Sequence, residues 1–192
     1  MSTPLAPAVP GRLSVGSLAQ ANKHKRRFDA ILTLQDPGSP MSKRLVFTRG
    51  APPPRLVLEF EDFDYADRGV MVATFEQVHE LLAFARQHES AALLVHCYHG
   101  IGRSAAAALA VLADRAGAGN EDMAVAELFA LRPEATPNLV VTALADDVLA
   151  RQGALVAALA SWEQVRPQSL AQRARRLAFY EQNPGLFAHR KA

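Results

Sequence analysis

Cysteine is almost absent from this sequence, because Cys97 is the only one among 192 residues. A single cysteine excludes an intramolecular disulfide, and the shortage suits a reducing compartment such as the cytoplasm. An excess of charge is lacking too, since 21 basic and 19 acidic side chains give a formal net charge of +2. This balance provides no bulk attraction to nucleic acid or to a membrane surface, so we expect neither as a partner.

Long hydrophobic runs are missing as well, and the first ten residues have neither a basic start nor an apolar centre. We therefore expect no signal peptide and no membrane insertion. No pair of histidines or cysteines has the spacing of metal ligands, so we predict no metal site. What the chain does have is 49% hydrophobic residues, enough for the core of one domain.

The stretch that carries chemistry is residues 95–104, Val-His-Cys-Tyr-His-Gly-Ile-Gly-Arg-Ser. The apolar residues 91–95 favour a strand before it, and the alanine-rich residues 105–113 favour a helix after it. The loop between them therefore leads into a helix N-terminus, where unpaired N–H groups and the helix dipole attract anions. Gly100 and Gly102 allow the loop to curl so that its N–H groups point inward. The pattern predicts an anion site.

Cys97 lies at the base of this predicted site, and the positive field there favours its nucleophilic thiolate form. Arg103 offers a planar fork that can bind two oxygens of a phosphate at once. Ser104 is placed to hydrogen-bond the sulfur and to help it leave. The competing interpretation is a buried, inert cysteine before a helix.

The spacing His-Cys-x5-Arg-Ser resembles the signature loop of the protein tyrosine phosphatase superfamily, most closely its small, dual-specificity-like bacterial branch. The resemblance implies that Cys97 attacks phosphorus to form a cysteinyl-phosphate, that Ser104 assists thiolate release, and that no metal or cofactor takes part. It also implies a supporting role for His96, which would order the loop. The groups that would bind phosphate are Tyr98, His99, Gly100, Ile101, Gly102 and Arg103.

A general acid is also needed, because a phenolate or alkoxide leaves slowly unless a carboxylic acid protonates it. The family keeps a mobile aspartate for this purpose in a loop after a strand, some 30 to 35 residues before the cysteine. Three aspartates compete here: Asp62 directly follows the predicted strand, Asp64 has the spacing of ordinary dual-specificity enzymes, and Asp67 lies furthest into the loop. We expect Asp62 or Asp64 to act.

The remaining pattern predicts an α/β fold, with a small, mostly parallel central sheet flanked by helices on both faces. A loose N-terminus (1–11) would precede a phosphatase domain (12–155), over which the resemblance extends. A C-terminal helical extension (156–192) would pack on this domain or dock a partner. Expected strands cover 12–17 at an edge, 28–34 at the centre, 45–47, 56–60 and 91–96. Expected helices cover 18–27, 74–87 with a capping box of Thr74 and Gln77, 104–116, a segment after Asn120, and a segment capped by Thr136.

The expected function is metal-independent hydrolysis of phosphate monoesters, as a protein-tyrosine or dual-specificity phosphatase. Its partner would be a phosphorylated protein or a small phosphate monoester. Phosphoinositides are less favoured, because the loop lacks the extra lysines of the relatives that act on them. Two alternatives stay open: a phosphate-binding pseudophosphatase without a working acid, and a rhodanese-like sulfurtransferase, whose loop is usually one residue shorter.

Overall fold

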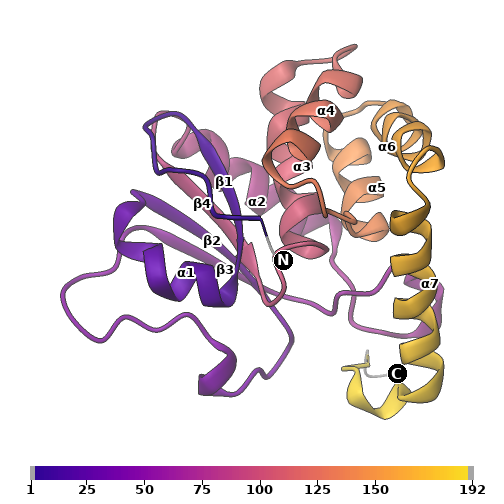
Figure 1. Ribbon diagram of the computed structural model, residues 1–192, viewed down its shortest axis with the longest axis horizontal. Helices are drawn as coiled ribbons and strands as arrows, with labels where there is room; N and C mark the ends of the chain where they lie inside the picture. Colours follow the sequence, from indigo (N-terminus) through magenta and orange to yellow (C-terminus); the bar gives the residue numbers. More distant parts are fainter. Residues whose placement is uncertain (1–2, 190–192) are drawn as a thin grey trace.

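The protein is built on a four-stranded sheet in which all neighbouring strands run parallel (Figure 1). The structure is a computed structural model that describes residues 3–189. The strands are β1 (Leu13–Ser17), β2 (Ala30–Gln35), β3 (Arg55–Glu59) and β4 (Leu93–Cys97). Their order is β1-β4-β2-β3, so β4 and β2 occupy the centre. The predicted α/β fold with a parallel sheet and an edge strand at β1 is confirmed.

The two central strands are apolar along most of their length, and every residue of both is buried. Such continuous burial is typical of parallel strands that are covered on both faces. Successive residues alternate between the faces: Leu93 and Val95 join the larger core, whereas Leu94 joins the smaller one. Cys97 continues this alternation onto the larger-core side at the carboxyl end of β4.

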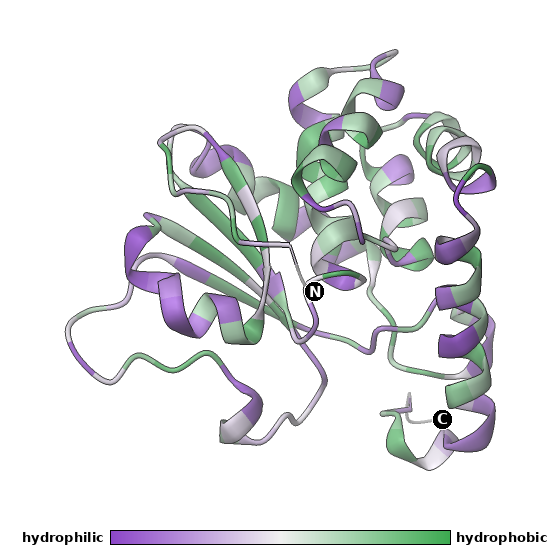
Figure 2. Cartoon of the chain, in the orientation of Figure 1, coloured by the Kyte–Doolittle hydropathy of each residue, from purple (hydrophilic) through white to green (hydrophobic). Residues whose placement is uncertain are grey.

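Helices cover both faces of the sheet (Figure 1). The smaller core lies under α1, together with Phe28 and Leu45, and the larger core lies under the helices that follow β3. Figure 2 shows hydrophobic residues gathered along the strands and along α3, which packs on them. The helices are α1 (Leu18–His24), α2 (Phe75–Gln87), α3 (Arg103–Ala116), α4 (Glu121–Leu131), α5 (Leu139–Val148), α6 (Ala154–Gln164) and α7 (Pro167–Gln182). The 3-10 turns within residues 3–189 are η1 (Lys25–Arg27), η2 (Met41–Lys43), η3 (Ala66–Arg68) and η4 (Pro184–Leu186).

Local capping signals predicted one helix start well and another badly. At α2 the capping box of Thr74 and Gln77 is present, as predicted. The prediction of Thr136 as a cap is wrong, because α5 begins at Leu139 and Asn138 caps it by accepting the Val141 N–H at 3.0 Å. Thr136 instead donates its N–H to the carbonyl of Ile101 at 2.8 Å. Thr136 is thus held against the cysteine loop, and the helix starts after Asn138, two residues later.

The predicted strand over 45–47 is also wrong, since these residues form no strand. Leu45 is buried in the smaller core, and its carbonyl accepts a hydrogen bond from the side chain of Arg55 at 2.8 Å. That bond leaves the segment attached to β3 by a side chain rather than by a backbone ladder.

Both ends of the chain are attached to the sheet-and-helix body. Residues 3–11 contain no helix or strand, but Thr3 donates its N–H to Glu134 at 2.9 Å and Leu5 packs on the smaller core. The tail forms two helices, α6 and α7, and its Trp162 ring stacks on Phe129 with the centroids 5.3 Å apart. Residues 1–2 and 190–192 of the predicted end segments lie outside the described residues.

Candidate active site

The loop between β4 and α3 wraps around the sulfur of Cys97. This side chain is 2% exposed, and its Sγ accepts the N–H of Gly100 at 3.2 Å. The Ser104 hydroxyl, in the first turn of α3, lies 3.2 Å from the same sulfur. The backbone N–H and the hydroxyl both lie within hydrogen-bond distance of the sulfur, which is therefore held in place at the centre of the loop.

Gly100 is required by the way the loop packs. Its φ is +79°, and a Cβ added there would lie 2.5 Å from the backbone carbon of Gly16 and 2.6 Å from the nitrogen of Ser17. The carbonyl of Gly100 accepts the Nε–H of Arg132 at 3.1 Å. Arg132, which is fully buried, also forms an ion pair with Glu134 at 3.5 Å. Its role in this structure is to hold the outside of the loop.

Arg103 begins α3 and is 3% exposed. One terminal nitrogen pairs with Asp36 at 2.7 Å, and the other donates to the carbonyl of Phe60 at 2.6 Å. Burial opposes its charge, but the charges of Asp62, Cys97 and Asp36 outweigh burial and raise its pKa, so it stays a cation. Its buried Nε–H has no hydrogen-bond partner within residues 3–189 and remains able to donate to an anion.

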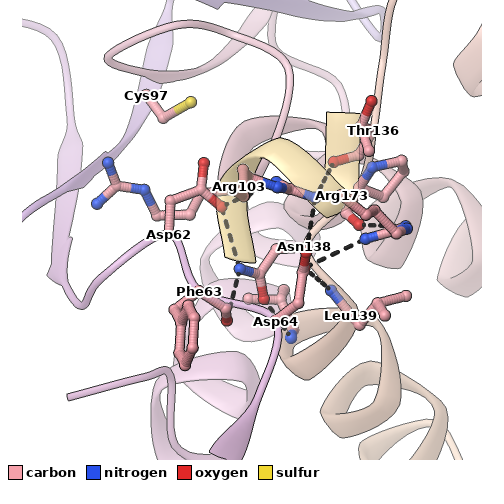
Figure 3. A network of polar contacts seen from close by, with 12 residues as sticks. Asp62, Phe63, Asp64, Cys97, Arg103, Thr136, Asn138, Leu139 and Arg173 are labelled. Carbon is pink, nitrogen blue, oxygen red and sulfur yellow. Dashed lines mark hydrogen bonds and ion pairs between the residues drawn. The ribbon is translucent and has the colours of Figure 1, made fainter. Parts of the chain in front are cut away.

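The three candidate acids occupy different environments. Asp62 lies directly over the loop, because a Cβ added to Gly102 would overlap its carboxylate. Asn138 donates to Asp62 Oδ1 at 3.1 Å, and Figure 3 shows the other carboxylate oxygen on the side of Cys97. The side chain of Asp62 is 22% exposed. Asp62 can therefore meet a group bound at the loop.

Asp64 points away from the loop and is held by three groups (Figure 3). It accepts the N–H of Leu139 at 2.9 Å and pairs with Arg173 at 3.2 Å and Arg176 at 2.8 Å. With a side chain only 4% exposed, it is placed as a structural anchor at the start of α5. Asp67 lies in η3 with its side chain 81% exposed, and its ion pair with Arg68 spans 3.9 Å.

His96 is buried beside the thiol but faces the other side of the sheet. Its Nε2 lies 2.9 Å from the hydroxyl of Thr33, and burial, with a contribution from the charge of Arg55, lowers its pKa to about 4. The imidazole is therefore neutral near pH 7. A neutral ring held by a neighbouring strand fits the supporting role implied by the resemblance.

Tyr98 and His99 extend outward from the loop, and both side chains are exposed. Their rings meet edge to face with centroids 4.8 Å apart, and Lys43 Nζ lies 5.6 Å from the centre of the Tyr98 ring. A pocket that reaches the thiol is lined by Cys97, Arg103, Tyr98 and Lys43, together with residues of β2. An aromatic and a basic side chain thus stand at its rim.

Sequence reasoning missed three residues that the structure brings to the site. Asp36 pairs with Arg103, Asn138 holds Asp62, and Arg176 lies 3.4 Å from the Asp62 carboxylate. Asp36 had a readable signal, since it follows β2 and the carboxyl ends of parallel strands meet at one edge of a sheet. Asn138 and Arg176 are 76 and 114 residues from Asp62 in sequence, and no local pattern links them.

Within residues 3–189, no three histidine, cysteine, aspartate or glutamate side chains gather in a group that could hold a metal ion. None of the helices in the same range combines the length and the apolar character needed to cross a membrane.

Comparison with solved structures relates this fold to known phosphatases. Human DUSP28 is 18% identical with a TM-score of 0.57, and the match covers 80% of this chain and 98% of DUSP28. A mouse protein described as a dual specificity phosphatase, solved with zinc tungstate, is 23% identical with a TM-score of 0.55, covering 80% and 91%. Tk-PTP in its active form is 19% identical with a TM-score of 0.52, covering 79% and 99%.

No protein-family model matches the sequence, and no curated protein is significantly similar to it. At these identities the likeness establishes the fold. The chain therefore has the fold of the protein tyrosine phosphatase superfamily, which the resemblance of the cysteine loop predicted.

Proposed function

We propose that this protein is a metal-independent phosphate-monoester hydrolase that works through a cysteinyl-phosphate intermediate. One observation carries the proposal: Cys97 Sγ accepts the Gly100 N–H at 3.2 Å in a loop over which Asp62 lies, and Cys97 and Arg103 line the same pocket. A candidate nucleophile, a buried cation and a carboxyl group thus lie close enough to one another for the charges of Cys97 and Asp62 to raise the pKa of Arg103. The fold shared with dual specificity phosphatases supports the same reaction class.

In the first step, the Cys97 thiolate attacks phosphorus and the bond from phosphorus to the ester oxygen breaks. Asp62 donates its proton to the departing oxygen, a contribution worth about 10²–10⁴-fold in typical general acid catalysis. Arg103 and the loop N–H groups hold the three remaining phosphoryl oxygens, whose charge they stabilise in the transition state. The products of this step are the free alcohol and phosphorylated Cys97.

In the second step, a water molecule attacks the phosphocysteine while the Asp62 carboxylate accepts its proton. The sulfur–phosphorus bond breaks, inorganic phosphate leaves, and Cys97 returns to its thiolate form. The Ser104 hydroxyl, 3.2 Å from the sulfur, hydrogen-bonds the departing thiolate. The cycle consumes one water and leaves the enzyme unchanged.

The substrate class we favour is a phosphorylated protein, on tyrosine or with dual specificity, in a reducing compartment such as the cytoplasm. The exposed Tyr98 ring and the ammonium of Lys43 at the pocket rim support a substrate that presents a ring and a negative charge. A phosphotyrosine peptide has both features. Its hydrolysis should exceed that of the matched phosphoserine peptide.

The deciding experiment follows hydrolysis of p-nitrophenyl phosphate from pH 5 to 8 in EDTA, with wild type and Cys97→Ser. We expect turnover that resists EDTA and is lost in the variant. Absence of wild-type turnover while vanadate still binds would favour the pseudophosphatase alternative. Transfer of sulfur from thiosulfate to cyanide would favour the rhodanese alternative, and loss of activity in EDTA would contradict metal independence.

A further inference from the structure

The part of the C-terminal extension that begins with α7, residues 167–189, contacts the acid-bearing loop, which we define as residues 61–72. The first contacts are ionic. Arg176 pairs with Asp62 at 3.4 Å and with Asp64 at 2.8 Å. Arg173 pairs with Asp64 at 3.2 Å (Figure 3). Arg173 is itself fixed by Glu163 at 2.7 Å, and Arg176 donates to the carbonyl of Thr136 at 3.3 Å. Both arginines, which lie on α7, therefore connect the acid-bearing loop to α6 and to the segment before α5.

A separate aromatic cluster provides the second set of contacts. Phe63, which is 1% exposed, packs against Tyr180 and Phe187 with ring centroids 4.3 and 5.9 Å away. Val70 and Val72 complete this small core from the far side of the loop. Phe63 lies between Asp62 and Asp64 in sequence, so burial of its ring fixes the backbone that carries both carboxylates.

Backbone hydrogen bonds provide the third set. Met71 donates its N–H to the carbonyl of Ala188 at 2.8 Å, and Ala188 donates its own N–H to Glu61 at 2.8 Å. Val70 and His189 form an antiparallel bridge beside them. The acid-bearing loop is thus attached to the C-terminal extension at both of its ends and in its middle.

We propose that the C-terminal extension clamps the acid-bearing loop over Cys97, with Arg176 as the positioning residue for Asp62. This inference rests on the proposed function. The resemblance to the phosphatase family implies an aspartate that moves into place, and mobile loops have few buried apolar contacts and few protected hydrogen bonds. This loop instead has buried apolar contacts at Phe63 and backbone hydrogen bonds to Ala188, so the acid is preorganised before substrate binds. Leaving-group protonation therefore depends on α7, a helix outside the cysteine loop.

The test compares Arg176→Gln and Arg176→Lys with a matched control on the same helix, Arg175→Gln. Arg175 is exposed and makes no hydrogen bond or ion pair within residues 3–189. The substrates are p-nitrophenyl phosphate, whose leaving group is good, and phenyl phosphate, whose leaving group needs the acid. We expect Arg176→Gln to lower kcat for phenyl phosphate by about tenfold or more, part of the general-acid contribution. The loss of kcat for p-nitrophenyl phosphate should be smaller. Arg176→Lys should recover part of the kcat for phenyl phosphate that Arg176→Gln loses, and Arg175→Gln should match wild type with both substrates.

A second measurement needs neither a variant nor activity. Hydrogen exchange of the wild-type amides of Met71 and Ala188 should be slow, because each donates to a group across the clamp. Exchange at the rate of free amides would overturn the clamp. So would an Arg176→Gln variant that turns over both substrates like wild type. Lack of turnover in wild type would instead refute the proposed function, and the role of Arg176 with it.

Discussion

The buried histidine before the thiol makes a prediction about acid stability that can be worked out from the structure. His96 is 1% exposed, and burial lowers its pKa from 6.5 to about 4. Between these values the unfolded chain binds a proton that the folded protein does not bind. Stability therefore falls as the pH falls from 6.5 towards 4, by about 3 kcal/mol in total at about 1.4 kcal/mol per pKa unit.

Urea unfolding at pH 7.0 and pH 4.5 should measure this loss against His96→Gln as the control. A glutamine can keep a contact with the Thr33 hydroxyl, 2.9 Å from the imidazole, but it gains no proton in this range. We expect wild type to lose about 2 to 3 kcal/mol more than the variant between the two pH values, because the other titrating groups cancel in the difference.

Equal losses in the two proteins would refute this reasoning, as would an NMR titration of the His96 ring with a midpoint near 6.5. The same result bears on mechanism. If the ring stays neutral down to about pH 4, it contributes neither limb of a pH–rate profile measured between pH 5 and 8. It would then support the loop without carrying a proton.

Three further predictions concern the acid-bearing loop. Asp62→Asn should lower kcat for phenyl phosphate by about 10²–10⁴-fold, whereas the exposed Asp67→Asn should match wild type; equal losses would contradict our choice of acid. Gly102→Ala should push the Asp62 carboxylate off the loop. In the double variant, Gly102→Ala should therefore lower kcat little beyond the loss caused by Asp62→Asn alone, and a kcat loss equal to the product of the two single losses would contradict this coupling. Phe63→Ala should lower the free energy of unfolding by about 3–5 kcal/mol in urea, and a loss below about 1 kcal/mol would contradict its role in the aromatic cluster.

The geometry of the cysteine loop, for which we propose phosphate binding, could be predicted because its determinants are local. Cys97, Gly100, Arg103 and Ser104 lie within eight residues, and the flanking strand and helix have unambiguous patterns. The capping box at Thr74 was readable for the same reason, since its partner is three residues away. Interactions between residues a few positions apart can be recognised from one sequence without knowledge of the fold.

The acid could not be assigned from the sequence, because Asp62 and Asp64 differ only in what the fold brings to them. Asp62 meets Gly102 and Asn138, whereas Asp64 meets Arg173 and the start of α5. Neighbouring carboxylates in one loop thus face a reaction site and a structural anchor. The wrong helix start at Thr136 also reflects distant contacts: the backbone N–H of Thr136 binds the carbonyl of Ile101 in the cysteine loop, and Asn138, two residues later, caps α5.

The roles of the basic and aromatic residues of the tail also follow from contacts with residues distant in sequence. In the sequence they suggest either a docking helix or ordinary packing, but Arg173 and Arg176 meet the two carboxylates, and Tyr180 meets the ring between them. The candidate site is therefore divided into a local half, for which we propose phosphate binding by Cys97 and Arg103, and a non-local half, which holds the proposed acid Asp62. Because the halves share few residues, changes in α7 should alter leaving-group dependence while phosphate binding at Cys97 and Arg103 persists.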